Sequence, residues 1–162
     1  MGNGIDANKT TSFKPEVNYV SRDSNNNGVV GKIDNIENEI LFPPGSMTIS
    51  LGGSFLGSSF IQKESFYTAQ NVAVAQEKTP LSIYSKLFIS SLIRHECKVK
   101  FLAFGRELNK HIRTDFSIKL PVLQDQNGFI LDKEKRYSED GFQPDFEVMK
   151  NINISLPFAD RI

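Results

Sequence analysis

Short apolar segments, separated by polar stretches rich in glycine and asparagine, occupy the first half of the chain. Brief runs that alternate or cluster apolar side chains are typical of strands with a buried face. Such runs lie at 17–21, 29–33, 47–51, 61–62, 66–68 and 71–75. Asn27-Gly28 and Pro43-Pro44-Gly45 separate some of them with residues that favour tight turns. This half therefore predicts a sheet with polar loops.

One long helix is predicted after these strands. Thr79 offers a capping side chain and Pro80 suits a first helical turn. Along Leu81–Glu96, helical spacing places one stripe of side chains on a single face, namely Tyr84, Leu87, Phe88, Ser91, Leu92 and His95. We expect this stripe to pack on the sheet.

The last third of the chain predicts shorter elements. Arg106–Arg113 suits an irregular turn or short helix, Ser117–Val122 a strand, and Asp125–Gly128 a hairpin turn into a strand at 129–131. Gln143-Pro144 would begin another short helix. The expected fold class is α/β of the α+β type: one domain over residues 1–162, with a twisted, mostly antiparallel or mixed sheet, one long helix and one or two short ones.

Composition limits the cellular compartment in which the protein is expected. The 162 residues contain a single cysteine, so no internal disulfide framework can form and a reducing compartment is expected. No stretch approaches the roughly 20 apolar residues of a membrane span, and the polar start has no apolar signal region. We therefore expect a soluble, cytoplasmic protein that does not contact a membrane.

Positive charge is concentrated in the middle of a chain whose net charge is zero. Lys86–Lys119 contains eight basic and three acidic side chains, a net of +5. A local positive field on a neutral protein suits a docking surface for a polyanion. A solvated helix edge followed by a loop would show the same excess, so charge alone leaves both interpretations open.

Arg22–Gly28 carries the second candidate binding feature, because Asn25, Asn26 and Asn27 follow one another. An asparagine amide can pair bidentately with adenine in the major groove, and Arg22 could take guanine or phosphate. A surface turn whose amides bond their own backbone is the equal alternative.

Glycine and serine recur between two apolar segments at 52–60. The stretch is not a phosphate-binding loop, because Ser58 stands where the lysine should be and the dinucleotide spacing of glycines is absent. A bulge or corner in a sheet and a close approach of backbone to a ligand remain.

Catalytic groups are not persuasive in this sequence. His95 and Cys97 are two residues apart on a helix, so they face different sides and make a poor base and nucleophile. We expect a small buried Cys97, no metal site and no enzymatic activity, since two histidines and one cysteine cannot make a standard zinc site. A small hydrolase is disfavoured, and a non-catalytic β-rich module that binds protein or carbohydrate is the alternative to DNA binding.

The succession of motifs resembles the target recognition domain of the specificity subunit of type I restriction-modification systems, and the related domain of type II restriction-methylation enzymes. The matching residues run in order along the chain: Val20-Ser21-Arg22, Asn26–Val29, Gly52-Gly53-Ser54, Gly57–Phe60, Phe66-Tyr67, Gln70–Val72, Phe104-Gly105-Arg106, Lys119-Leu120-Pro121 and Pro144-Asp145-Phe146. The usual N-terminal segment and the spacer helix of such domains are not seen in this sequence.

The resemblance implies a non-catalytic module that reads double-stranded DNA and directs a methyltransferase subunit, and often a nuclease subunit, to its target. The module itself would need no cofactor, whereas S-adenosylmethionine is expected on the methyltransferase partner. A homodimer is compatible with this arrangement. The residues expected to contact DNA are Arg22, Ser24, Asn25, Asn26, Asn27, Ser54, Arg106, Lys110, His111 and Arg113.

Overall fold

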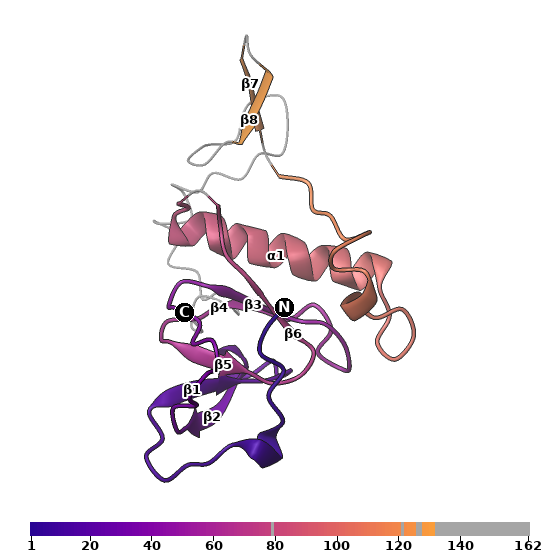
Figure 1. Ribbon diagram of the computed structural model, residues 1–162. Helices are drawn as coiled ribbons and strands as arrows, with labels where there is room; N and C mark the ends of the chain where they lie inside the picture. The colour runs from indigo at the N-terminus through magenta and orange to yellow at the C-terminus, as the bar shows by residue number, and fades with distance from the viewer. Residues whose placement is uncertain (79, 121, 126–127, 132–162) are drawn as a thin grey trace.

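Two three-stranded sheets lie one below the other beneath a single long helix in the computed structural model (Figure 1). The structure describes residues 1–78, 80–120, 122–125 and 128–131 of the 162-residue chain. The helix is α1 (Ile83–Lys100), and three short 3₁₀ turns are η1 (Ala7–Lys9), η2 (Asn26–Gly28) and η3 (Leu108–Lys110). The mixed α and β fold predicted from the sequence is confirmed.

The first sheet is mixed and has the strand order β2-β1-β5. Its strands are β1 (Val17–Val20), β2 (Val29–Ile33) and β5 (Phe66–Thr68). β1 pairs with β2 in the antiparallel sense and with β5 in the parallel sense. Since parallel strands end at the same edge, the segments that follow β1 and β5 leave the sheet together.

The second sheet is antiparallel and has the order β4-β3-β6. Its strands are β3 (Met47–Ser50), β4 (Ser59–Ile61) and β6 (Val72–Ala75). A separate antiparallel pair is formed by β7 (Val122–Asp125) and β8 (Gly128–Leu131). Six predicted strands of the first half thus form, within a residue or two of their expected bounds. They divide between two sheets.

The predicted turns of the first half are present. Asn27 and Gly28 have φ of +54° and +79° where the chain reverses from β1 into β2. Gly45 has φ +82° in the turn before β3, and the Ser46 N–H donates to the Pro43 carbonyl. A positive φ at the third position of a turn is what a type II turn requires.

Helix α1 begins and faces differently from the prediction. The cap is Ser82, whose side chain accepts from the Ser85 N–H, so the helix starts beyond Pro80; Thr79 lies outside the described residues. The buried helical residues are Ser85, Ser90, Ile93 and Cys97, whereas Ser91 and His95 of the predicted stripe are exposed.

Hydrogen bonds to strand β4 explain this rotation. Ser90 Oγ donates to the Ser59 carbonyl at 2.7 Å, and Arg94 Nη2 donates to the same oxygen at 2.9 Å. These bonds turn a face with small side chains toward the sheet, and small side chains let the helix come close to the strand. The apolar spacing of the sequence could not show this preference.

The predicted strand at Ser117–Val122 is wrong for most of its length. Residues 117–120 have no regular structure, and β7 begins only at Val122. Ile112, Phe116 and Ile118 are partly buried against the core between α1 and the second sheet. Their apolar side chains cover the core from an irregular segment, so the pattern resembled a strand without being one. The predicted helix from Gln143 lies outside the described residues.

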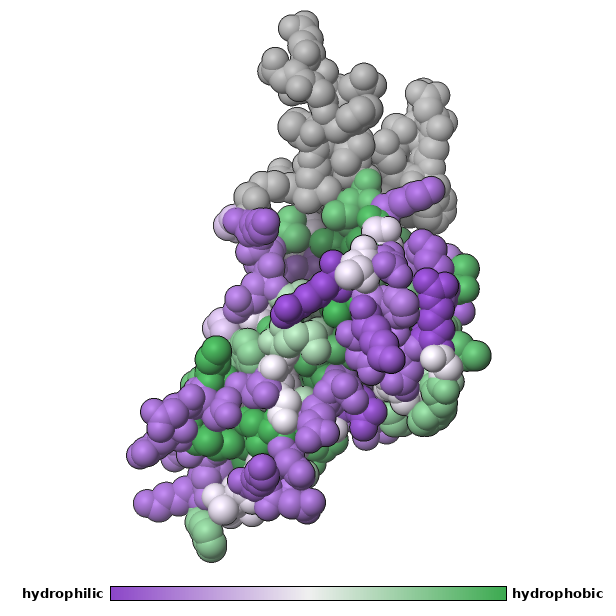
Figure 2. All heavy atoms as spheres, turned by 45° about the vertical axis from the view of Figure 1, so that its right-hand side comes forward, coloured by the Kyte–Doolittle hydropathy of each residue, from purple (hydrophilic) through white to green (hydrophobic). Residues whose placement is uncertain are grey.

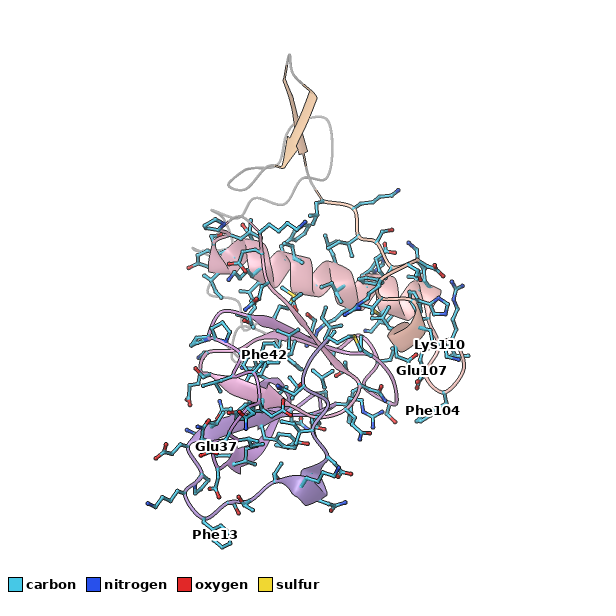
Figure 3. The ribbon with its side chains drawn as sticks, viewed as in Figure 1. Phe13, Glu37, Phe42, Phe104, Glu107 and Lys110 are labelled. Atoms are coloured by element: carbon cyan, nitrogen blue, oxygen red, sulfur yellow. The ribbon has the colours of Figure 1, made fainter. Side chains whose placement is uncertain are left out.

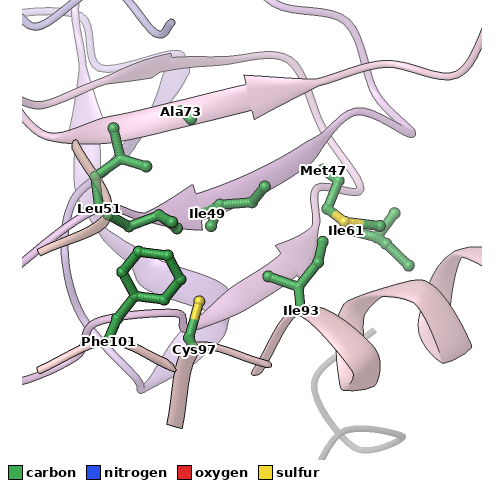
Figure 4. Close-up of a cluster of buried hydrophobic side chains, with 9 residues drawn as sticks. Met47, Ile49, Leu51, Ile61, Ala73, Ile93, Cys97 and Phe101 are labelled. Atoms are coloured by element: carbon green, nitrogen blue, oxygen red, sulfur yellow. The ribbon is translucent and has the colours of Figure 1, made fainter. Parts of the chain in front are cut away.

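The main core lies between α1 and the second sheet (Figure 4). Its buried members come from β3, β4, β6, the helix and the segment that follows it: Met47, Ile49, Leu51, Ile61, Ala73, Ile93, Cys97, Phe101 and Leu108. A smaller cluster that includes Val20, Phe66 and Val72 joins the two sheets. Burial of these side chains supplies most of the stabilisation of a domain of this size.

The N-terminal residues cover the outer face of the first sheet as an ordered arm. Ile5 bridges to Ala69 in the parallel sense, and Tyr19 Oη donates to the Ile5 carbonyl at 2.7 Å. Asp34 holds the next part of the arm. Its carboxylate accepts from Thr11 Oγ1 at 2.6 Å and from the N–H groups of Phe13 and Lys14.

Asp34→Asn should loosen this arm. The hydrogen bonds from Thr11, Phe13 and Lys14 lower the pKa of Asp34. A lowered folded-state pKa means that the stabilisation is present above the unfolded pKa of about 4 and is lost as pH falls through the folded value. We expect a lower melting temperature near neutral pH, a smaller loss of stability on acidification, and faster chymotryptic cleavage after Phe13. Unchanged cleavage would contradict this role, and the exposed Glu37→Gln serves as the control.

Candidate nucleic-acid interface

Three loops meet where β1, β5 and β3 end. The Val20 carbonyl accepts from the Ala69 N–H at 2.8 Å, which joins the ends of β1 and β5. The Asn71 carbonyl accepts from the Leu51 N–H at 2.9 Å, which joins the turn after β5 to the loop after β3. Strand pairing therefore brings together residues 21–28, 51–58 and 69–71, which are distant in the sequence.

A fourth segment, residues 102–111, is fixed to the same place. The Leu51 carbonyl accepts from the N–H groups of Leu108 at 2.9 Å and Asn109 at 3.2 Å. Leu108 is fully buried beneath this segment. Figure 3 shows Phe104, Glu107 and Lys110 at this end and Phe13 far from it. We call residues 21–28, 51–58, 69–71 and 102–111 together the loop end.

Glu107 links the 102–111 segment to the 51–58 loop at Gly52 and Gly53. Its Oε1 accepts from the Gly53 N–H at 2.8 Å. A Cβ at Gly52 would lie 2.6 Å from Glu107 Oε2, so only glycine leaves room for the carboxylate. A Cβ at Gly53 would lie 3.3 Å from Arg22 Nη1. The groups that approach the backbone of this glycine-rich stretch are side chains of the chain itself, whereas the approach to a ligand stays a prediction.

Gly57 closes the same loop against the helix. It has φ +78°, and a Cβ there would lie 2.3 Å from Cys97 Cβ. Cys97 is 1% exposed, as the prediction of a small buried group requires.

The Cys97 thiol should resist alkylation in the folded protein. Burial raises its pKa to about 11, so almost no thiolate exists at pH 8. We expect an iodoacetamide reaction that follows global unfolding and speeds up with urea. Fast labelling of the folded protein at pH 8 would contradict this burial.

Cations at the loop end differ in how far they are already neutralised. Arg22, Lys110 and Arg113 are exposed and make no ion pair among the residues that the structure describes. Arg106 Nη2 lies 3.9 Å from Asp115 Oδ2, and its guanidinium lies 5.3 Å from the Phe101 ring centre. The first three are therefore the better placed to meet an anion.

His111 is largely engaged with a carboxylate. Its Nδ1 lies 2.7 Å from Asp115 Oδ2. Hydrogen bonds from the side chains of His111 and Thr114 hold the pKa of Asp115 below its usual value, with Arg106 contributing less. Asp115 therefore stays ionised at neutral pH and offsets part of the positive field. Hydrophilic side chains cover most of this side of the molecule (Figure 2).

The positive charge of Lys86–Lys119 is not one surface. Lys86 pairs with Glu77 at 2.6 Å and donates to the Gly45 carbonyl, near the start of α1. Lys110 lies beyond the other end of α1, whose 18 residues extend about 27 Å. The net charge of the segment therefore overstates the field at any single place.

The three asparagines have different environments. Asn26 Nδ2 donates to the Val29 carbonyl at 3.1 Å, as a turn amide does. The Asn27 carbonyl accepts from Gln62 Nε2 at 2.8 Å. Asn25 is exposed, and its side chain makes no hydrogen bond within the described part of the chain. Of the three, Asn25 has the amide that is most available to a ligand.

Some predicted contacts lie close together at the loop end, others lie elsewhere within it, and Arg113 lies just beyond it. Arg22 lies against Gly53, next to the exposed Ser54, and Arg106, Lys110 and His111 share the segment that Glu107 joins to Gly53. Asn26 and Asn27 instead border a hollow with Gln62 and Lys63, beyond the far end of β4. A three-residue strand spans about 10 Å. Ser24 is half-buried, and Arg113 is exposed in the turn after η3.

Sequence reasoning missed the residues that organise this site. In the sequence, Glu107 is only one of the three acidic side chains of Lys86–Lys119, and Phe104 is only part of the Phe104-Gly105-Arg106 motif. The one available signal was the glycine pair at 52 and 53, because paired glycines mark a close approach of some group.

The described residues contain no group of three or more histidine, cysteine, aspartate or glutamate side chains placed to hold a metal ion. Among their helices, none is long and apolar enough to cross a membrane.

Comparison with known proteins gives one match. A family model described as the type I restriction modification DNA specificity domain matches residues 2–133. Neither the curated proteins nor the solved structures yielded a match.

Proposed function

Because this chain belongs to the type I restriction-modification DNA specificity family, we propose that its loop end reads a short sequence in double-stranded DNA. The observation that carries the proposal is the hydrogen-bonded convergence of four separate segments on one end of two sheets. Loops held by a rigid scaffold are the usual carriers of recognition, since side chains there can vary without disturbing the core.

The roles of the side chains follow from their exposure and charge. Arg22, Lys110 and Arg113 would contact phosphates, which gives affinity without sequence information. Asn25 would read a base edge, since its amide is exposed and can both donate and accept.

The module would act as part of a larger complex in the cytoplasm. A methyltransferase subunit, which would carry S-adenosylmethionine, is the expected partner, together with a nuclease subunit in a complete restriction system. The chain itself would position these subunits on DNA and carry out no chemistry. Residues 1–162 would form one recognition domain.

Selection from a random duplex pool by the full chain tests the proposal. We expect one short sequence to be enriched, and binding to weaken steeply as salt rises because phosphate contacts release counterions. Selection is repeated with the methyltransferase subunit present, since the complex presents the domain as it works. Absence of enrichment in both experiments, or binding that ignores salt, would refute the proposal and favour a protein or carbohydrate ligand.

A further inference from the structure

Phe104 has a positive φ, and every other described non-glycine residue with a positive φ is an asparagine. Five non-glycine residues in the described chain have positive φ, and four of them are Asn26, Asn27, Asn38 and Asn71. Phe104 is the fifth, with φ +60°. Asparagine tolerates this region because its short polar side chain bonds locally, whereas a bulky residue there is strained.

The strain is not compensated by burial. The Phe104 side chain is 81% exposed, so its ring gains little from the fold. Strained residues persist where the surrounding structure holds them and where function uses the side chain. Stability therefore does not account for phenylalanine at this position.

The loop that carries Phe104 is closed and tied to its neighbour. The Leu102 N–H donates to the Arg106 carbonyl at 2.9 Å, and the Gly105 N–H donates to the Leu102 carbonyl at 3.1 Å. Glu107 Oε1 accepts from the Phe104 N–H at 3.4 Å and from the Gly53 N–H at 2.8 Å. These bonds present the ring from a defined place.

The hollow beside the ring is lined by polar and charged side chains, and the exposed Leu102 lies two residues away in the same turn. Phe104 borders a hollow of about 320 Å³ that Lys110 and His111 also line, and Arg106 is two residues away. An exposed aromatic ring among cations matches a partner with flat apolar groups set between negative charges. Stacked bases between two phosphate backbones have that arrangement.

We propose that Phe104 inserts its ring into the base stack of the bound duplex and partly unstacks one base step. The neighbouring cations hold the phosphates on either side. This inference rests on the proposed DNA-reading function. It adds that the Phe104 ring acts as a wedge between two stacked bases. Because the cost of opening a step depends on its bases, the wedge would make the protein prefer a flexible step at a position without hydrogen-bond readout.

Phe104→Asn is the matched test, since asparagine accepts the backbone conformation and removes the ring. The variant should melt at or above the temperature of the wild-type protein. Full-chain wild-type protein should raise the fluorescence of 2-aminopurine placed at one step of the selected duplex. The variant should abolish this rise and bind that duplex roughly ten- to a hundred-fold more weakly, with an unchanged salt slope.

Phe13→Asn controls for loss of an exposed ring, because Phe13 is 89% exposed at the other end of the molecule. It should leave both readouts unchanged. Equal fluorescence and equal affinity for wild-type and Phe104→Asn proteins would overturn the wedge. The same result with lost association to the methyltransferase subunit would assign the ring to a protein contact. If the wild-type protein shows no salt-dependent duplex binding, the proposed function itself fails.

Discussion

Replacing Arg22 and Lys110 together by glutamine should weaken binding to every duplex. Both side chains are exposed at the loop end and make no ion pair within the described chain, so both are available to phosphate. Loss of two phosphate contacts should reduce the slope of log K against log salt by about 1.8. If each contact contributes about 1 kcal/mol, the Kd should rise roughly thirty-fold at low salt. Filter binding or fluorescence anisotropy at several salt concentrations measures both quantities.

A matched variant separates the interface from net charge. Lys14 precedes β1 and Lys78 follows β6, so both lie at strand ends opposite the loop end. Replacing these two lysines by glutamine changes the net charge by the same amount and should leave the salt slope within error. Equal losses in the two double variants would show that binding follows total charge and would reject the placement of the interface.

The Gly57→Ala protein should be destabilised by about 2–4 kcal/mol. The new Cβ would lie 2.3 Å from Cys97 Cβ, and alanine would also have to adopt φ +78°. Overpacking of a core commonly costs about 1–3 kcal/mol, and a left-handed residue adds to it. Urea denaturation followed by circular dichroism measures the loss.

Gly4→Ala isolates the contribution of the backbone. Gly4 has φ +74°, but no atom lies within 4 Å of a Cβ built there. Its replacement should therefore cost only about 1 kcal/mol. Equal losses at the two glycines would show that the contact between the 51–58 loop and α1 is not close.

The strands could be predicted because their apolar pattern and their turn residues agree. Asn27-Gly28 favours a chain reversal between two apolar runs, and the structure has positive φ at both residues. The face of α1 could not be predicted, because Ser90 is small and polar in sequence. Its burial depends on one carbonyl of β4, at Ser59, which no helical period reveals.

The site was only partly predictable for a similar reason. A local motif such as three asparagines identifies a candidate loop, but not which amides its own backbone uses, as Asn26 shows. The hydrogen bond from the Gly53 N–H to the Glu107 carboxylate joins residues that are 54 apart in the sequence. Such a pairing depends on how the two sheets and the helix are placed, so it becomes visible only in three dimensions.

The bonds that assemble the loop end have a consequence for how a protein that reads DNA there could change its target. Three of the four junctions use main-chain carbonyls, at Val20, Leu51 and Asn71, and a main-chain acceptor is indifferent to the side chain attached to it. Most residues of these loops could therefore be substituted while the two sheets and the helix keep their arrangement. New specificities would then arise by substitution at the tips, with Gly52 and Glu107 as the pair that has to be inherited together.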